Sequence, residues 1–243
     1  MLRSWLKLFR VVNLPTVPGD VLVGVAASSF AVDGYVPALV ARAAGISVLI
    51  YMFGLVDNDL VGAKTDKGRP IADGEISMNA AKIAWFVLFA SVPLLAYLSH
   101  LPTEWCAPAY LLMTTIMIYN RTKSVIAMGC CRGLNVGCGF AVAVGEAQSV
   151  WLLDWRLLVP FAVAGIFTLY IAAVTKYSEG EETDPARKAR VGMLIGAHIY
   201  LQLIALIVFA LLIPSTAPLM VAGAILLVVL RILKHTLPGV SAS

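Results

Sequence analysis

Residues 36–56 read VPALVARAAGISVLIYMFGLV, and residues 57–77, which follow directly, read DNDLVGAKTDKGRPIADGEIS. The first stretch is apolar apart from Arg42 and Ser47 and has the length of a helix that crosses a bilayer. The second stretch carries charges of both signs, and Pro70 and Gly74 favour turns in it. This succession predicts a membrane span followed by a polar loop that leads into the next span.

The composition of the whole chain agrees with this class. Of its 243 residues, 60% are hydrophobic and only 13% are charged, and the mean hydropathy is +0.88. A soluble domain usually has about 25% charged residues, so too few charges remain here to cover a soluble surface. This excludes a soluble enzyme and a disordered chain. We predict an integral, multi-pass membrane protein in which residues 1–243 form a single domain.

Apolar segments recur along the chain and predict an all-α bundle of eight transmembrane helices. The residues before the first span have apolar side chains at helical spacing and Arg3, Lys7 and Arg10 mostly elsewhere on the wheel. They form either a helix that lies in the membrane interface or a plain basic flank of the first span. We expect the eight spans near residues 15–32, 36–56, 80–98, 105–119, 124–146, 157–177, 191–212 and 217–233.

The basic residues between the spans predict the orientation of the protein. Fourteen of the 18 Lys and Arg residues fall on one side of the predicted bundle. By the positive-inside rule, this side is cytoplasmic, so both termini face the cytoplasm of a plasma or inner membrane. The fourteen residues are Arg3, Lys7, Arg10, Lys64, Lys67, Arg69, Arg121, Lys123, Lys176, Arg187, Lys188, Arg190, Arg231 and Lys234.

Acidic residues are scarce in this sequence and gather in two places. Five of the 14 lie within residues 57–75 and four within residues 179–184, both at cytoplasmic ends of predicted spans. Two facing acidic clusters offer the oxygen ligands that Mg²⁺ prefers, although both segments also fit simple solvated loops. In the first segment, Asn58, Gly62 and Asp66 share one face if the helix continues past the membrane. Lys67 and Arg69 follow at once, and such cations suit a diphosphate.

At this loop the sequence resembles the UbiA superfamily of intramembrane prenyltransferases. The first signature of that family is N-D-x-x-D-x-x-x-D, followed shortly by R-P-[IL]-x-x-G-x-[IL]-S between the second and third helices. The chain matches this signature at Asn58-Asp59, at Asp66 and over residues 69–77. Three further stretches resemble the family in the same order along the chain: residues 5–24 its first helix, residues 119–123 the segment after its fourth, and residues 128–135 the fifth helix of one branch.

The chain also departs from the family pattern. Gly62 stands where the family has the middle aspartate, and the linker from Asp66 to Arg69 is shorter than usual. Residues 177–184, YSEGEETD, replace the second D-x-x-x-D motif, and eight predicted spans replace the usual nine helices. The resemblance therefore implies a divergent, shortened member of the family with a weakened metal site.

The resemblance implies transfer of a polyprenyl group from a prenyl diphosphate to an aromatic or other lipophilic acceptor in the membrane, with Mg²⁺ as the cofactor. The partners implied are this diphosphate, the acceptor and membrane lipid, with no nucleic acid. A general base is not identified. The residues implied are Asn58, Asp59, Asp66, Glu181 and Glu182 for the metal, Lys67, Arg69, Lys123 and Arg132 for the diphosphate, and Asn135 and Tyr170 for the acceptor or cavity.

Two alternatives remain open at this point. Gly62 and the missing second motif also fit a catalytically impaired relative that binds or moves a lipid or assists a partner. An unrelated transporter is disfavoured because the intramembrane charges are few and no repeat is visible. Arg132 requires an explanation in either case, because a lone cation within a span costs about 2.5–3.5 kcal/mol. It lines a polar cavity that contacts substrate, or it forms a hydrogen-bonded node between helices with Asn135.

Overall fold

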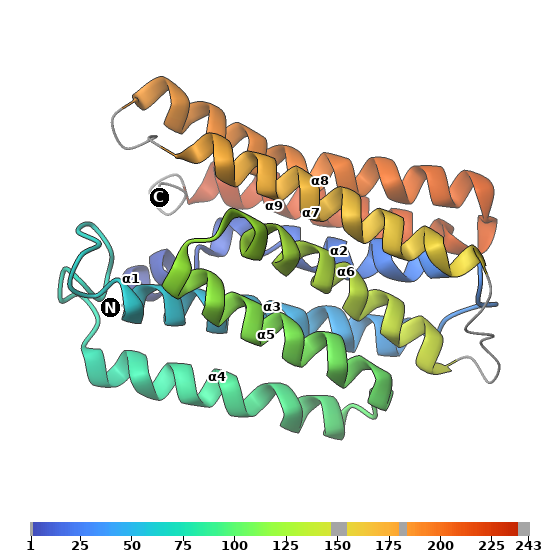
Figure 1. The fold of residues 1–243 in the computed structure, drawn as a ribbon, viewed down its shortest axis with the longest axis horizontal. Helices are drawn as coiled ribbons and strands as arrows, with labels where there is room; N and C mark the ends of the chain where they lie inside the picture. Colours follow the sequence, from blue (N-terminus) through green and yellow to red (C-terminus); the bar gives the residue numbers. More distant parts are fainter. Residues whose placement is uncertain (1, 147–154, 180–183, 238–243) are drawn as a thin grey trace.

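The structure is a computed structural model that describes residues 2–146, 155–179 and 184–237. These residues form α-helices joined by short 3₁₀ turns and loops, and no strand occurs among them (Figure 1). The helices are α1 (Leu2–Leu8), α2 (Thr16–Ser28), α3 (Pro37–Val61), α4 (Met78–Leu98), α5 (Thr103–Thr122), α6 (Val125–Glu146), α7 (Leu158–Ser178), α8 (Pro185–Leu212) and α9 (Ala217–Thr236).

The eight predicted spans correspond to α2 through α9, which confirms the all-α fold. Seven segments of the described chain are long and apolar enough to cross a membrane. The remaining long helix, α5, has 20 residues but is less apolar, since it carries Glu104 in its first turn and Arg121 in its last. The protein is therefore an integral, multi-pass membrane protein.

Two helices are longer at the end that carries the polar loops than hydropathy alone predicts. α3 continues to Val61, five residues beyond the predicted span. α8 begins at Pro185 because the Asp184 carboxylate accepts hydrogen bonds from the backbone N–H groups of Ala186 and Arg187, at 2.9 and 3.1 Å. This is a regular N-cap, which satisfies otherwise unpaired donors at the start of a helix.

Helix α2 lies at the centre of the bundle, packed against α3, α6, α8 and α9 (Figure 1). Every residue of α2 except Pro18 is buried. Helices α2 and α6 pack closely because each has a glycine that faces the backbone of the other helix. A Cβ at Gly24 would lie 2.0 Å from the Val136 carbonyl oxygen, and a Cβ at Gly139 would lie 2.1 Å from that of Val21. Small residues permit this approach of two helix backbones.

We expect Gly139→Ala to lower the free energy of unfolding by about 1–3 kcal/mol, because the new Cβ forces α6 away from α2. The measurement is denaturation of the purified protein in mixed detergent micelles, followed by circular dichroism. Gly165→Ala in α7 is the matched control, since a Cβ there meets nothing within 4 Å. That substitution gains helix propensity and is expected to be neutral or stabilising. Equal effects of the two substitutions would contradict the close packing of α2 and α6.

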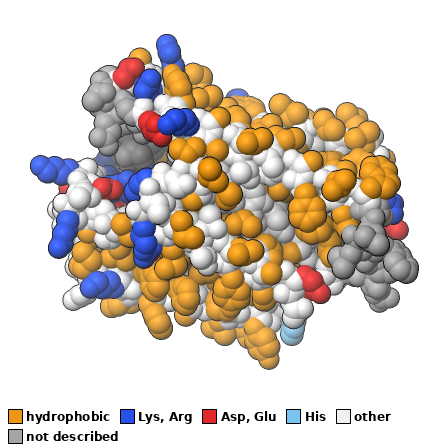
Figure 2. All heavy atoms as spheres, in the orientation of Figure 1, with side chains coloured by type: hydrophobic (Ala, Val, Ile, Leu, Met, Phe, Trp, Pro, Cys, Tyr) orange, Lys and Arg blue, Asp and Glu red, His pale blue; other side chains and the backbone are white. Residues whose placement is uncertain are grey.

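Helix α1, the last turns of α9 and the polar loop over residues 62–77 lie at one end of the bundle, on the left of Figure 1. Lys and Arg side chains gather at this end, whereas hydrophobic side chains cover the middle of the molecule (Figure 2). We call it the basic end; it includes Arg10, Lys67, Arg69 and Lys123. The arrangement agrees with termini and basic loops that share one side of the membrane, and the cytoplasmic assignment of that side stays a prediction.

Candidate functional site

The candidate site at the basic end begins where α3 ends. Asp57, Asn58 and Asp59 occupy the last turns of α3 and are buried. Asn58, Gly62 and Asp66 would share one helix face only if the helix continued to residue 66, and it does not. α3 ends at Val61, and a turn brings Asp66 back, since its backbone N–H donates to the Gly62 carbonyl oxygen at 2.8 Å.

Gly62 makes room for the Asp66 carboxylate. A Cβ at position 62 would lie 2.3 Å from Asp66 Oδ2, so a larger residue would displace that side chain. The Thr65 hydroxyl donates to Asp66 Oδ1 at 2.8 Å and holds it in place. The glycine that replaces the middle aspartate of the expected motif is thus the residue that lets Asp66 pack here.

Arg69 joins the two carboxylates of the site. Its guanidinium donates to Asp59 Oδ1 at 2.9 Å through one terminal nitrogen, and its Nε lies 3.2 Å from Asp66 Oδ2. Asp59 is buried, whereas Asp66 and Arg69 are partly exposed. Of the residues predicted from sequence, the structure therefore brings Asp59, Asp66 and Arg69 together.

Lys123 directly follows α5, and its side chain extends to the same site at the end of α3. Its ammonium donates to Asn58 Oδ1 at 2.6 Å and lies 5.6 Å from the centre of the Tyr119 ring. Burial lowers the pKa of Lys123 below its ordinary value, the cations Arg69 and Arg10 lower it further, and Asp66 and Asp57 oppose them. The basic end therefore gathers three cations near two carboxylates. The third cation is Arg10, which is not among the site residues predicted from the sequence.

Asp57 is occupied by structural contacts. The indole N–H of Trp85 donates to Asp57 Oδ1 at 3.0 Å, and Asn120 and Arg121 donate to Oδ2 at 2.8 and 3.2 Å. These bonds tie α3 to α4 and α5 beneath the site. Residues 119–123 resemble the family pattern, but that resemblance does not predict their contact with Asp57.

The described residues do not form a ready magnesium site. No group of three or more His, Cys, Asp or Glu side chains gathers around one point within residues 2–146, 155–179 and 184–237. Asp59 and Asp66 already pair with Arg69, and the Asn58 oxygen accepts from Lys123. The donors fit Mg²⁺ only after both cations have moved away, because each neutralises or occupies a ligand oxygen.

The other predicted residues of this end have simpler surroundings. Lys67 is exposed in the loop beside Arg69. Glu181 and Glu182 lie outside the described residues. Their described neighbours serve local structure: Asp184 caps α8, and Glu179 ends α7, where its carboxylate accepts from Lys176 at 2.7 Å.

A second polar cluster lies inside the bundle and is centred on Asp20 of α2. This carboxylate is fully buried. Its Oδ1 contacts His198 Nε2 at 2.8 Å and accepts from the Gln202 amide at 2.6 Å, while Oδ2 accepts from Arg132 at 3.0 Å and from Asn135 at 3.1 Å. Asp20 thus joins α2, α6 and α8, and it is not among the site residues predicted from the sequence.

Arg132 and Asn135 belong to this inner cluster, about two helical turns into α6. Arg132 also donates to the Thr16 hydroxyl at 3.2 Å, and Asn135 donates to the Val17 carbonyl oxygen at 2.9 Å and accepts from Ser47. Of the two roles left open for Arg132, the contacts match the node between helices. Its assignment to the diphosphate beside Arg69 and Lys123 gains no support from them, because its charge is already balanced by Asp20.

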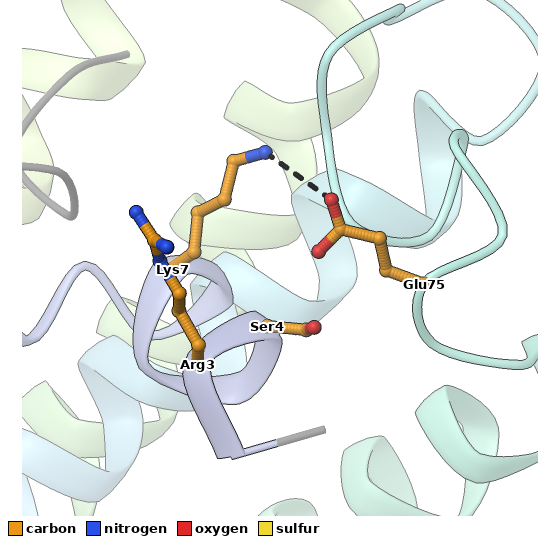
Figure 3. Close-up of a pocket in the computed structure, with 4 residues that line it drawn as sticks. All are labelled: Arg3, Ser4, Lys7 and Glu75. Atoms are coloured by element: carbon orange, nitrogen blue, oxygen red, sulfur yellow. Dashed lines mark ion pairs between the residues drawn. The ribbon is translucent and has the colours of Figure 1, made fainter.

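Tyr170, predicted to contact an acceptor, packs between helices. Its hydroxyl donates to the Leu194 carbonyl oxygen at 2.7 Å, and its ring stacks on His198 with 5.9 Å between centroids. Two surface pockets lie elsewhere. One, of about 290 Å³, is lined by Arg3, Ser4, Lys7 and Glu75 (Figure 3), where the Lys7 ammonium is 3.7 Å from the Glu75 carboxylate. The other lies between α8 and α9.

The arrangement of helices in this chain resembles that of known structures. No protein-family model and no curated protein matches the chain. Several solved structures resemble it over most of their length. A UbiA homologue from Aeropyrum pernix K1, without ligand, has a TM-score of 0.60 and 18% identity, and the match covers 94% of this chain and 90% of that one.

Two further solved structures match the chain to a similar extent. A UbiA homologue from Archaeoglobus fulgidus bound to GPP and Mg²⁺ has a TM-score of 0.57 and 15% identity, over 96% of this chain and 87% of that one. A digeranylgeranylglyceryl phosphate synthase in membranes has a TM-score of 0.55 and 15% identity, over 99% and 91%. The chain therefore has the fold of the UbiA homologues, as the sequence motifs predict.

Proposed function

We propose that this chain, built on the UbiA fold, binds a polyprenyl diphosphate at its basic end and transfers the prenyl group to an aromatic or other lipophilic acceptor in the membrane. The observation that carries the proposal is the cluster of Asp59, Asp66, Arg69 and Lys123. These residues fall in the segments that resemble the family, and the fold brings them together. A neighbour with this fold binds GPP and Mg²⁺.

In this reaction Arg69 and Lys123 stabilise the diphosphate as it leaves. The bond between prenyl C1 and the diphosphate oxygen breaks, the electron pair leaves with the diphosphate, and an allylic cation remains. Arg69 can grip two diphosphate oxygens at once, and Lys123 adds a point charge beside them. Preorganised donors aimed at developing negative charge lower the barrier. The acceptor then bonds to C1 and loses a proton to a base that we do not assign.

Magnesium is part of the proposal under one condition. The candidate ligands are Asn58, Asp59 and Asp66, with Glu181 and Glu182 from the α7–α8 connection. When bound, Mg²⁺ would neutralise the diphosphate as it leaves. Arg69 must first release its two carboxylates, and a bound diphosphate offers the guanidinium an equivalent pair of oxygens. We therefore expect diphosphate and metal to bind together and the metal alone to bind weakly.

A second candidate function is lipid binding without transfer. The observations that favour it are the internal pairing of Arg69 with Asp59 and Asp66 and the presence of Gly62 at the position of a metal ligand in the expected motif. If Arg69 keeps its carboxylates, the basic end binds a phosphorylated lipid through Lys123 and Arg10 and leaves it intact.

Prenyl transfer can be measured with the purified protein in liposomes, using radiolabelled prenyl diphosphates of several lengths, mixed phenolic acceptors and Mg²⁺. We expect a labelled lipophilic product from the wild type. For Asp66→Ala we expect a loss of at least about 10²-fold in rate, because that variant lacks a carboxylate that we assign to Mg²⁺, the ion that would neutralise the leaving diphosphate. Glu75→Gln is the matched control, since Glu75 lies at the same end and pairs only with Lys7 in the described chain.

The outcomes separate the two functions. Binding of prenyl diphosphate without turnover by the wild type would support the lipid-binding alternative. Turnover that Asp66→Ala and Glu75→Gln reduce equally would show that the cluster is not the reaction site. Absence of both binding and turnover with every prenyl length would overturn both functions.

A further inference from the structure

A groove between α8 and α9 opens at the basic end, away from the site described above. The groove is open to the surface and has a volume of about 230 Å³. Its lining is mostly apolar and includes Met193, Ala197, Leu227 and Leu230, while Arg231 and Lys234 supply positive charge. An apolar groove with cations at the membrane boundary has the character of a site for a charged amphiphile rather than for a small soluble ion.

Lys234 crosses the groove from α9 to α8. A Cβ at Gly196 would lie 2.8 Å from the Lys234 ammonium, so the nitrogen rests directly over the backbone of α8 at this glycine. The side chain makes no ion pair with a carboxylate in the described part of the chain. Its charge is therefore available to an anion that enters the groove.

Arg231 lies one turn before Lys234 on the same face of α9. Its guanidinium donates to the Tyr200 hydroxyl at 2.7 Å and stands over the Tyr200 ring, 5.9 Å from its centre. Because this hydroxyl accepts from Arg231, its own hydrogen remains free to donate. No carboxylate among the described residues pairs with Arg231. Two cations and one hydroxyl donor thus converge without an anionic partner.

The positions of Arg231 and Lys234 along α9 match the depth of a lipid headgroup in the membrane. Arg231 and Lys234 lie in the last two turns of α9, which ends at Thr236. Long basic side chains at the end of a span extend to the interface, and basic pockets between transmembrane helices bind anionic headgroups. We propose that the groove binds the phosphate of an anionic phospholipid from the surrounding leaflet, with an acyl chain against its apolar lining.

The test is a titration of the purified protein in detergent, followed by native mass spectrometry, with phosphatidylglycerol, phosphatidylcholine and inorganic phosphate as separate probes. We expect phosphatidylglycerol to bind more tightly than phosphatidylcholine. The double variant Arg231→Gln/Lys234→Gln should lose roughly 30-fold in affinity for phosphatidylglycerol, the effect of two basic residues near an anionic surface. The matched control is Arg3→Gln/Lys7→Gln, which removes the same charge from the pocket of Figure 3.

Tyr200→Phe is a milder second variant, which keeps the ring and removes only the hydroxyl that contacts Arg231. It should weaken phosphatidylglycerol binding several-fold without disturbing the fold. Equal losses in the two double variants would overturn the proposal, because the effect would then be one of net charge. Equal affinity for phosphatidylcholine would also overturn it, as would binding of inorganic phosphate as tight as that of the lipid.

Discussion

Asp20→Ala is expected to lower the free energy of unfolding by about 3–5 kcal/mol, one of the two largest effects that we predict for this protein. The substitution leaves Arg132 as an uncompensated charge within the bundle, and breaking a buried ion pair from one side costs this much. It also removes the acceptor of His198, Gln202 and Asn135. The measurement is reversible denaturation in mixed micelles, followed by circular dichroism.

The double variant Asp20→Leu/Arg132→Met distinguishes the ion pair from loss of packing. It removes both charges, so we expect it to be more stable than either Asp20→Leu or Arg132→Met, since an apolar pair carries no unpaired charge. Glu104→Ala is the control for a carboxylate outside the cluster; Glu104 is exposed, and its loss should change stability by less than about 0.5 kcal/mol. Strictly additive effects of the two single substitutions would contradict the node.

Arg69→Gln is expected to reduce prenyl transfer by about 10²- to 10³-fold, because the guanidinium that stabilises the leaving diphosphate is lost. The same substitution should tighten binding of a divalent cation in the absence of prenyl diphosphate. It frees Asp59 and Asp66, to which Arg69 is bonded at 2.9 and 3.2 Å. A fall in turnover together with a rise in metal affinity would show that Arg69 pairs with the two carboxylates when the diphosphate is absent and with the diphosphate when it is bound.

Metal affinity can be read without turnover, by electron paramagnetic resonance of Mn²⁺ titrated into the purified protein. Lys64→Gln is the matched control, since Lys64 is an exposed cation of the same loop and should alter neither quantity. If Mn²⁺ binding is unchanged in Arg69→Gln while turnover falls, Arg69 acts on the diphosphate alone. If neither changes, the assignment of the site at the basic end is wrong.

The span positions could be predicted because hydropathy is a local property of the chain. Each of α2 through α9 lies within a few residues of a predicted apolar segment. The errors occur at the basic end, where α3 continues to Val61 and α8 begins at Pro185. There the helix ends are set by capping and turn contacts, such as the Asp184 cap and the Asp66 turn, rather than by the water–lipid boundary.

The inner cluster could have been partly foreseen. Asp20 is a carboxylate within an apolar span, and such a residue must find a partner inside the bundle. Arg132 and His198 are the complementary signals in two other spans. Their meeting nevertheless depends on how α2, α6 and α8 pack. The approach of α2 to α6 depends on the close contacts of Gly24 and Gly139, and the approach of α2 to α8 depends on Gly19, which faces the Gln202 side chain. Nothing in the spacing of residues 20, 132 and 198 specifies it.

The sequence by itself determined that this is a membrane-embedded helical bundle, which residues form its spans and which loops carry the charges of the basic end. These properties follow from apolar run length and from local charge. Only the tertiary structure decided the partner of each charged side chain: Arg69 pairs with both Asp59 and Asp66, Arg132 pairs with Asp20, and Lys123 donates a hydrogen bond to the Asn58 amide oxygen. Ion pairs between distant segments depend on ångström-scale distances after packing, and a linear sequence does not contain those distances.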